Sequence, residues 1–386
     1  MVNRCFAPAT DRLANVILTA AFLAAIAAPL LGHFCGLEGG GPLRENRGLA
    51  ARPALGTTPR QWRKFVLGYR GYFNDNFGFR SLLVRLHAIA WVQWLDSAPN
   101  ERVLLGRDGW LYLNKCDQAI QSTRAANPFT PQDLEQWRNV LERRRDWFRE
   151  QGVVYVFAVA PDKSTIYPEH LPPSITRLNP KTRLEQLVEH VAGHSDVTVV
   201  DLRPALLAAK RQRPVYYQTD THWNGWGEYL AYRELMNAVS NRFPELGPRP
   251  QSAFRLEMHP GQFSGDQAGM AGLNDYLSED DVKLIPVNPP RFRPVPLQGI
   301  EKDAEGASTH VATECPAAGT HRLVMFHDSF GVGLQPLLSE HFGRAVYVRT
   351  LRFPRQILDR EKPDVVIQEV VERSLINGPP KRPFDD

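Results

Sequence analysis

Two short polar clusters, Asp220-Thr221-His222 and His327-Asp328-Ser329-Phe330, contain the residue types that could do chemistry. A serine hydroxyl is a poor nucleophile until a base takes its proton, and a histidine oriented by a carboxylate supplies such a base. Asp220 and His222 are two positions apart, so their side chains leave an extended segment on the same face. Together the clusters predict a site of the serine esterase type, with Ser329 as nucleophile, His222 as base and Asp220 as the residue that orients it.

Each cluster also has a simpler interpretation. Asp, His and Ser are common in turns, so either segment alone could be an ordinary junction between a strand and a loop. Within the second cluster, His327 lies two residues before Ser329 and is a competing base. We favour His222, because His327 falls among the last residues of a predicted strand.

Metal chemistry is the main alternative for the same part of the sequence. Five residues are of types that bind zinc or manganese: Asp220, His222, His259, Asp266 and His327. The chain has no Cys-x-x-Cys pair, and we predict no metal. It also lacks Gly-x-Gly-x-x-Gly and the phosphate-binding Gly-x-x-x-x-Gly-Lys-Ser/Thr, so we predict no cofactor.

Other residues are candidates for binding substrate. Lys163 follows the strongest predicted strand, at the sheet edge where ligands bind, and could contact substrate or help to form an oxyanion hole. A solvated loop lysine is the alternative. The backbone N–H of Ser329 is a second candidate for the oxyanion hole.

Aromatic and charged residues extend this set. Trp223 and Asn224, which directly follow His222, suit a sugar ring, as does Trp226; packing at the start of a helix is an equal alternative. Glu369, Glu372 and Arg373 could line the cleft, or they could form a structural ion pair, which is the interpretation we favour.

The elements that must position these residues follow an α/β pattern. The apolar run 323–326 predicts a strand that ends at Ser329, where glycines indicate a sharp turn. Residues 153–160 form a nearly continuous apolar strand, which is typical of a sheet covered on both faces. From residue 130 strands and helices alternate, as in a parallel, doubly wound sheet. The expected helices are 130–151, 182–192, 204–210 and 225–239, and the other expected strands are 197–202, 345–348 and 364–370.

Two regions depart from this alternation. Residues 61–94 have a helical pattern with an aromatic stripe, which we attribute to packing, and residues 103–113 predict two short strands around an Asp-Gly turn. Between residues 241 and 319 the alternation stops, with nine prolines from Pro244 to Pro296. We predict an irregular insertion there.

A long apolar stretch lies near the N-terminus. Residues 13–34 contain no Lys, Arg, Asp or Glu, and as a helix they are long enough to cross a bilayer core of roughly 30 Å. Arg4 and Arg12 precede the stretch, as in a signal sequence or a signal anchor. We favour an uncleaved anchor with the polar remainder outside the cytoplasm, where Cys116 and Cys315 could form a disulfide or remain as two thiols.

The composition limits the classes of function. With 386 residues, 43% of them apolar, the chain can fill a sizeable core. Its formal charge of +4 comes from 46 basic and 42 acidic residues spread along the chain, so we predict no nucleic-acid partner.

At these motifs the chain resembles the AlgJ/AlgX family of SGNH hydrolase-like proteins, which take part in O-acetylation of bacterial exopolysaccharides such as alginate. The Asp-x-His-Trp motif with a later Asp-Ser-Phe is the specific part of the resemblance. The supporting pieces, in the expected order, are the N-terminal anchor, Glu45-Asn46-Arg47, Gly109-Trp110-Leu111-Tyr112, Val159-Ala160-Pro161-Asp162-Lys163, Tyr167-Pro168-Glu169, Gly265-Asp266 and Glu372-Arg373.

The resemblance implies a three-layer α/β SGNH hydrolase-like domain with a mostly parallel sheet, permuted so that Asp and His precede Ser. It implies an anchor at 1–36, a linker with helices at 37–102 and the SGNH domain at 103–386, with the insertion at about 241–319. Ser329, His222 and Asp220 would form the triad.

The resemblance also implies a setting and an activity. Ser329 would take an acetyl group from a membrane-bound O-acyltransferase and pass it to an exopolysaccharide, at the periplasmic side of a single-pass inner-membrane protein. His327 departs from the family, which often has Gly before Asp-Ser. The chain also lacks a C-terminal carbohydrate-binding module, which favours an AlgJ-like member. An acetylesterase with the same triad and a non-catalytic polysaccharide-binding scaffold remain alternatives.

Overall fold

The computed structural model describes residues 9–37, 39, 41–45, 47–115, 118–297 and 310–384. Two compact units are present: Met1–Asn100 with Ala268–Tyr276, and Glu101–Gln267 with Leu277–Asp386. Asn46 of the predicted motif and Cys116 of the possible disulfide lie outside the described residues. Cys315 is a buried free thiol.

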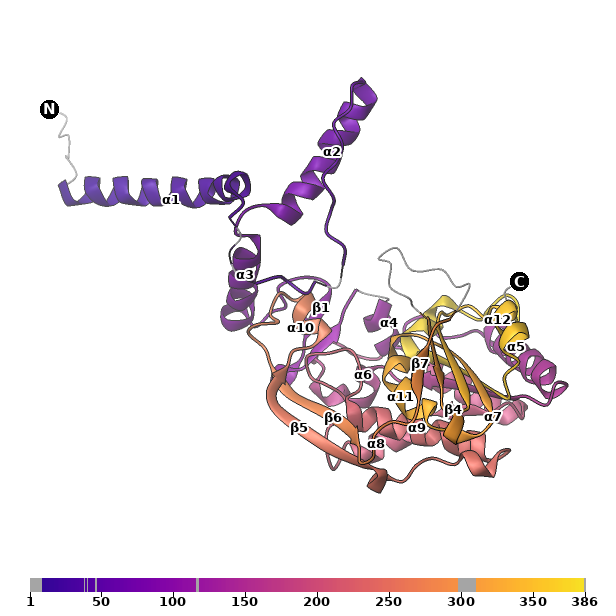
Figure 1. Cartoon of the computed structure of the whole chain (residues 1–386). Coiled ribbons are helices and arrows are strands. Elements are labelled where there is room, and N and C mark those ends of the chain that lie inside the picture. Colours follow the sequence, from indigo (N-terminus) through magenta and orange to yellow (C-terminus); the bar gives the residue numbers. More distant parts are fainter. Residues whose placement is uncertain are drawn as a thin grey trace. The chain divides into compact units, whose positions relative to one another are not determined.

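The first unit contains three helices, which are the dark elements near the N-terminus in Figure 1: α1 (Ala9–Cys35), α2 (Pro59–Asn76) and α3 (Arg80–Leu95). Within α1, the 24 residues Arg12–Cys35 are apolar enough to cross a membrane, and their most apolar part is exposed. Both a membrane anchor and a signal sequence have this length and apolar composition, so α1 fits either one. The predicted helical pattern at 61–94 is confirmed by α2 and α3.

The second unit is built on a mixed seven-stranded sheet with the strand order β4-β3-β11-β9-β10-β8-β7. The first five strands in this order pair in parallel, and β8 and β7 pair antiparallel at one end. The strand bounds are β3 (Val154–Ala160), β4 (Val199–Asp201), β7 (Arg293–Val295), β8 (His310–Glu314), β9 (Arg322–His327), β10 (Arg344–Arg349) and β11 (Val365–Val371).

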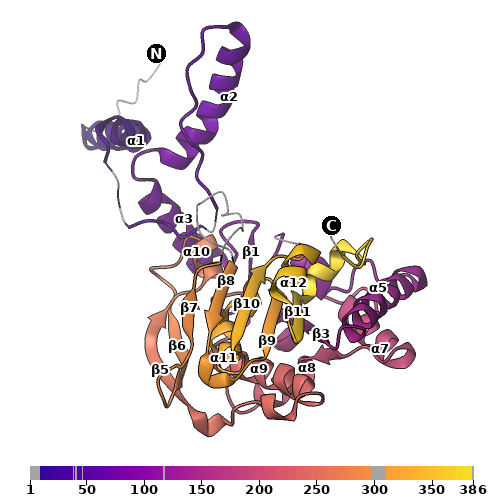
Figure 2. The same ribbon diagram turned by 45° about the vertical axis from the view of Figure 1, so that its right-hand side comes forward.

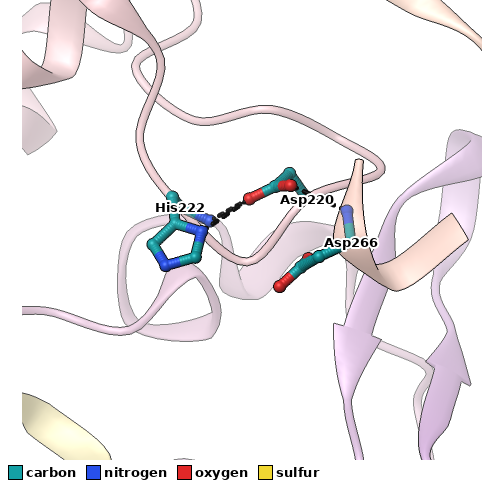
Figure 3. A group of neighbouring side chains, drawn as sticks. All are labelled: Asp220, His222 and Asp266. Atoms are coloured by element: carbon teal, nitrogen blue, oxygen red, sulfur yellow. Dashed lines mark hydrogen bonds and ion pairs between the residues drawn. The ribbon is translucent and has the colours of Figure 1, made fainter. Parts of the chain in front are cut away.

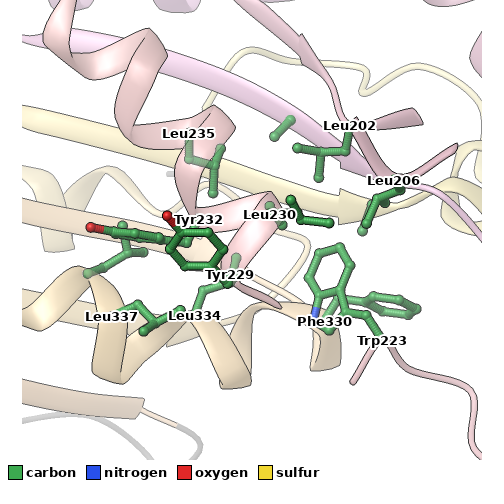
Figure 4. Close-up of a cluster of buried hydrophobic side chains, with 14 of the residues drawn as sticks. Leu202, Leu206, Trp223, Tyr229, Leu230, Tyr232, Leu235, Phe330, Leu334 and Leu337 are labelled. Atoms are coloured by element: carbon green, nitrogen blue, oxygen red, sulfur yellow. The ribbon is translucent and has the colours of Figure 1, made fainter. Parts of the chain in front are cut away.

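Alternate residues of the central strands supply two separate cores. Val156 and Ala158 point to one face, and Tyr155 and Phe157 point to the other. Helices α8 (Arg203–Ala209), α9 (Gly225–Ser240) and α11 (Gln335–Ser339) cover the first face; α5 (Pro131–Arg149), α7 (Arg183–His194) and α12 (Arg355–Glu361) cover the second. Figure 2 shows the two groups of helices around the sheet, and Figure 4 shows part of the first core. This double cover explains why β3 is apolar along its whole length.

The helices predicted at 130–151 and 182–192 and the short strands predicted at 103–113 are present. Thr130 is the N-cap of α5 in a capping box with Asp133, and Thr182 caps α7 in the same way with Glu185. Residues 103–113 form the antiparallel pair β1 (Val103–Leu105) and β2 (Leu111–Leu113).

The region 241–319 differs from the prediction of an irregular insertion. It contains the antiparallel pair β5 (Phe254–Phe263) and β6 (Glu279–Pro286), and its strands β7 and β8 extend the main sheet. These strands have at least one face exposed and alternate polar with apolar residues, so they lack the long apolar runs of the central strands. Three short helices complete the fold: α4 (Ala119–Thr123), α6 (Lys163–Ile166) and α10 (Asp266–Met270).

Candidate active site

The structure brings Asp220, His222 and Ser329 into one hydrogen-bonded chain. His222 Nδ1 lies 2.7 Å from Asp220 Oδ1, and His222 Nε2 lies 2.8 Å from Ser329 Oγ. Because an ionised carboxylate only accepts hydrogen bonds, Nδ1 carries the ring proton and Nε2 is free to accept from the serine hydroxyl. This is the arrangement in which a histidine can take a proton from serine.

Ser329 lies directly after β9, where it begins a 3-10 helix (Ser329–Leu334). The preceding Asp328 holds this bend: Oδ1 accepts from the backbone N–H of Phe330 at 2.9 Å, and Oδ2 accepts from that of Val371 at 2.6 Å. The backbone N–H of Asp328 donates to Glu369 Oε2 at 3.2 Å. The nucleophile position is therefore fixed mainly by backbone groups of β9 and of the neighbouring β11.

Glu369 is fully buried beneath this bend. Its Oε1 has no hydrogen-bond partner among the described residues. Burial, and then the charge of Asp328, raise the pKa of Glu369 well above its usual value. The carboxyl group is thus held neutral while it accepts the Asp328 N–H.

The loop 217–222, which carries Asp220 and His222, is held by charged side chains from other segments. Lys163 Nζ donates to the carbonyl oxygens of Gln218 at 2.9 Å and Asp220 at 2.6 Å, and it also contacts Tyr217 O and Gln267 Oε1. Glu279 accepts the backbone N–H groups of Gln218 and Thr219, each at 2.7 Å.

Asp266 completes the support of this loop, as Figure 3 shows. Its backbone N–H donates to Asp220 Oδ2 at 2.7 Å, and its carboxylate accepts from the N–H and the hydroxyl of Thr221. The close approach needs Gly265, since a Cβ there would lie 2.4 Å from the Asp220 Cβ. Both carboxylate oxygens of Asp220 are thereby occupied.

The two carboxyl groups of this pair differ in their proton affinity. Burial acts to raise the pKa of Asp220, but the hydrogen bond and charge of His222 and two backbone N–H donors outweigh it, so the pKa is lowered. Burial, and then the charge of Asp220, raise the pKa of Asp266. Asp220 is therefore the ionised partner that orients His222.

A cleft of about 540 Å³ opens beside Ser329, at the carboxyl ends of β9, β10 and β11. Polar and charged groups predominate in its lining, which includes Gln118, Asp328, Arg349, Thr350, Arg373 and Asn377. Ligands bind at this edge of open α/β sheets. The cleft is large enough to hold a sugar unit or an ester next to the serine hydroxyl.

Arg373 lies in this cleft lining with its guanidinium tied to the buried Asp162, at 2.6 Å between Nη1 and Oδ1. Glu372, its neighbour, accepts the backbone N–H of Asp162 at 3.0 Å and the Thr165 hydroxyl at 2.6 Å. Burial, and then the charge of Asp162, raise the pKa of Glu372 to about 7. Arg373 thus forms an ion pair as predicted, but with Asp162 and not with the expected Glu369 or Glu372, and it also faces the cleft.

Residues 103–294 match the family described as ALGX, an SGNH hydrolase-like domain of the acetyltransferase AlgX. This part of the chain is similar to the AlgX family, as the sequence motifs predict. Asp220 and His222 fall within the matched residues, and Ser329 follows them. The α/β fold with its mixed sheet is that of an SGNH hydrolase-like domain.

Relatives of this chain carry the name "Probable alginate O-acetylase AlgJ". The protein from Pseudomonas syringae is 26% identical over 216 residues, which are 56% of this chain and 52% of the relative. The protein from Pseudomonas putida is 26% identical over 287 residues, which are 71% of this chain and 70% of the relative. The chain thus spans about half the length of the first relative. The structure of Bacillus cereus PatB1 is similar in fold, with a TM-score of 0.52, 17% identity and coverage of 72% of this chain and 97% of PatB1.

Three residues that were predicted to contact substrate have structural roles instead. Lys163 is 4% exposed, and its ammonium is surrounded by three carbonyl oxygens of the loop 217–222 and by Gln267 Oε1. It therefore positions the loop and does not reach into the cleft. Trp223 is 2% exposed and packs edge-on against Phe330 (Figure 4). Asn224 caps α9 through the N–H groups of Trp226 and Gly227. Trp223 and Asn224 therefore follow the alternative interpretation, in which they pack at the start of a helix.

His327, the competing base, does not contact the serine hydroxyl. It is fully buried, with Nδ1 at 2.5 Å from Asp328 O and Nε2 at 3.2 Å from Gln335. Burial lowers its pKa. A Cβ at Gly331 would lie 2.5 Å from the His327 Cβ, so the unusual histidine and the glycine share a tight packing site.

Of the five possible metal ligands, the structure brings three close together: Asp220, His222 and Asp266 (Figure 3). Their donor atoms are engaged in the hydrogen bonds described above, which an ion would have to displace. His259 lies instead near Glu257 on β5. The chain also has a His-x-x-x-His pair on α7, His190 and His194, which the sequence interpretation passes over; their rings stack with centroids 4.5 Å apart.

Sequence reasoning found the supports of the site only in part. Glu369 was expected in an ion pair or in the cleft lining, but it accepts the Asp328 N–H beneath the serine bend, and Glu279 was not singled out. The Gly265-Asp266 motif was the sequence signal for the loop support. A buried acid at the end of an apolar strand such as β11 is the pattern that indicates such a role.

Proposed function

We propose that the protein is an O-acetyltransferase that modifies a bacterial exopolysaccharide through an acetyl-serine intermediate on Ser329. The observation that carries the proposal is the pair of hydrogen bonds, 2.7 Å and 2.8 Å, that joins Asp220, His222 and Ser329. The match of residues 103–294 to the AlgX family and the similarity to proteins named alginate O-acetylase support acetyl transfer as the chemistry.

In the first half-reaction, Ser329 Oγ attacks the carbonyl carbon of the acetyl donor while His222 Nε2 takes the hydroxyl proton. The tetrahedral intermediate then breaks the bond to the leaving group, which receives that proton from His222. Acetyl-Ser329 remains. Asp220 stabilises the imidazolium that exists between these proton transfers.

In the second half-reaction, a sugar hydroxyl attacks the acetyl carbon of acetyl-Ser329 and gives its proton to His222 Nε2. Collapse of the intermediate releases Ser329 Oγ, which recovers the proton, and the acetylated sugar leaves. Water can replace the sugar hydroxyl, which would give hydrolysis, so the acceptor must exclude water from the acyl-enzyme.

Each half-reaction passes through an oxyanion. The backbone N–H of Ser329, at the start of its 3-10 helix, and the guanidinium of Arg373 in the cleft lining are the groups that we assign to stabilise it. Because Asp162 holds Arg373 Nη1, the guanidinium is fixed before the charge develops.

The proposal includes a cellular setting. Helix α1 would be an uncleaved inner-membrane anchor, with residues 37–102 as the connecting region and residues 103–386 as a permuted SGNH domain in the periplasm. A membrane-bound O-acyltransferase would supply the acetyl group. The length and apolar composition of α1 support the anchor.

Acetyl transfer from a chromogenic acetyl ester to exopolysaccharide oligomers tests the proposal. We expect Ser329→Ala to abolish acetylated product, while Ser240→Ala, a serine at the end of α9, retains the wild-type rate. Equal product from Ser329→Ala would remove Ser329 as the nucleophile. If the wild type cleaves the ester but forms no acetylated sugar with any oligomer, the protein is an acetylesterase. If it cleaves no ester at all, a non-catalytic scaffold is favoured.

A further inference from the structure

Helix α2 has an aromatic face and a basic face. At helical spacing, Trp62, Phe65 and Tyr69 follow one another, and their ring centroids lie 5.8 Å and 5.5 Å apart. Tyr72 and Phe73 continue the stripe. The other side of the helix carries four basic residues, Arg60, Arg63, Lys64 and Arg70.

The aromatic face is only partly covered by the described residues. Phe65, Tyr69, Tyr72 and Phe73 are half-buried, the last two beside the His33 ring. None of the 18 residues of α2 is fully buried, and Trp62 and Val66 are 50% and 61% exposed. None of the four basic residues forms an ion pair with a described residue. The acidic residue of the helix, Asp75, is at its end and pairs with Arg47. A helix with this composition does not bury its apolar face in the protein that surrounds it.

Helix α3 continues the apolar surface. It contains no acidic residue and buries only Ala88, while Leu86 and Trp94 are 53% and 83% exposed. Its two arginines are engaged, Arg80 with Glu45 and Arg85 with Asp275. Large apolar side chains that stay exposed on a helix mark a surface for another apolar phase, such as lipid.

The helix pair is joined directly to the end of α1. His33 Nδ1 lies 2.7 Å from Asn76 O, the N–H of Gly78 donates to Pro29 O at 3.1 Å, and the His33 ring packs edge-on against Phe73. All these residues belong to the first unit. If α1 enters a bilayer, the turn between α2 and α3 lies where α1 leaves it.

We propose that α2 and α3 form a peripheral membrane-binding surface, in which the aromatic face of α2 inserts at the interface of an anionic bilayer and its basic residues contact lipid phosphates. Basic helices with aromatic residues on the opposite face lie in this manner in the interface plane. Lipid phosphates supply the negative charge that the four basic residues lack within the protein. This surface goes beyond the proposed acetyl transfer and does not depend on it; its role would be to hold the first unit flat against the membrane.

Depth-dependent tryptophan quenching in vesicles tests the proposal with the full chain. Wild type and Trp62→Phe are reconstituted into phosphatidylcholine vesicles with brominated acyl chains, with or without phosphatidylglycerol. The difference between the two proteins reports Trp62 alone. We expect bromine to quench Trp62, and the quenching to increase about twofold when the anionic lipid is present.

A charge variant separates lipid binding from general charge effects. Replacing Arg60, Arg63, Lys64 and Arg70 by Gln should remove the dependence on anionic lipid, and so should high salt. A matched control variant with the same loss of charge should retain the dependence on anionic lipid. It replaces four exposed residues of the second unit by Gln: Arg211, Lys362, Lys381 and Arg382. Circular dichroism confirms that both variants are folded.

The proposal is overturned if Trp62 is not quenched by brominated lipid in either vesicle. Protection of Trp62 from an aqueous quencher in the same samples, or crosslinks from position 62 to a second copy or to another membrane protein, would then identify a protein partner as the cover of α2. If the quenching of Trp62 changes neither with anionic lipid nor in the four-residue variant, the proposed role of the basic residues is wrong.

Discussion

The two halves of the candidate active site are held in place by different means. The bend at Ser329 is fixed by backbone groups of adjacent strands, with the carboxyl group of Asp328 between them. The loop with His222 belongs to no regular element and depends on side chains, above all those of Lys163 and Glu279. The comparison teaches that the strand end is held by two carboxyl groups that accept backbone N–H groups of adjacent strands. The irregular loop has fewer backbone hydrogen bonds and needs charged side chains from other segments to position the base.

The largest expected difference between the halves concerns their two aspartates. Asp220→Asn places an amide against His222 Nδ1, which forces the proton to Nε2 and removes the base, so we expect acetyl transfer to fall about a thousandfold. Asp328→Asn keeps one oxygen acceptor for the bend and should cost about tenfold. Steady-state rates of the two variants check this, and equal losses would show that both carboxylates serve only to hold the backbone.

The second prediction concerns the ammonium that holds the loop. Burial lowers the pKa of Lys163 to about 7, yet its surroundings offer only hydrogen-bond acceptors. Lys163→Met leaves these buried oxygens unpaired, and we expect the free energy of unfolding to fall by about 3 kcal/mol and transfer to fall more than tenfold.

Lys210→Met is the matched control for Lys163→Met. Lys210 also contacts a backbone carbonyl, that of Ile166, and a carboxylate, that of Glu169, but it is partly exposed and far less surrounded. Its loss should cost about 1 kcal/mol with transfer unchanged. Chemical denaturation of both variants distinguishes them, and similar costs would contradict the special role of the buried ammonium.

The third prediction tests the acid below the serine bend. Because Glu369 is held neutral, Glu369→Gln keeps the acceptor for the Asp328 N–H, and we expect a rate within about twofold of wild type. Glu369→Ala leaves that N–H unpaired and should reduce transfer about tenfold. A large loss with Gln would mean that the ionised carboxylate is required.

Replacing Glu372 should have the smallest effect on activity. Its effect is expected instead in the pH dependence of the free energy of unfolding. Its pKa in the folded protein, about 7, is above the ordinary value of 4.5, so the folded state binds the proton more tightly than the unfolded state. The free energy of unfolding therefore falls as pH rises from about 4.5 to about 7, and Glu372→Gln should remove about 2 kcal/mol of that fall. Thermal melts across this pH range check it; an unchanged pH profile would contradict the assignment.

The central elements could be predicted because their signals are local. Thr130 and Asp133 lie three residues apart and cap α5 as their spacing indicates, and the apolar run of β3 needs no information from elsewhere. The edge strand β7 and its neighbour β8 could not be predicted. Their short, mixed patterns become strands only through pairing with distant partners.

The same distinction applies to the site. The types and spacing of Asp220 and His222 were sufficient to identify a pair that the structure brings to Ser329. The environment of Lys163 was not predictable, since four oxygens from two other parts of the chain, residues 217–220 and Gln267, surround its ammonium. Trp223 followed the motif and looked accessible in sequence, but it is buried because α9 starts beside it.

The central claim is that Ser329 carries the acetyl group during transfer, with His222 as its base. Peptide mass spectrometry after rapid quenching of the wild-type protein with an acetyl donor, in the absence of acceptor, measures this directly. We predict one acetyl group on the peptide containing Ser329, lost when an oligosaccharide acceptor is added and absent from Ser329→Ala and His222→Ala. An acetyl group on another residue, or acetylated sugar formed without any acetyl-enzyme, would contradict the account.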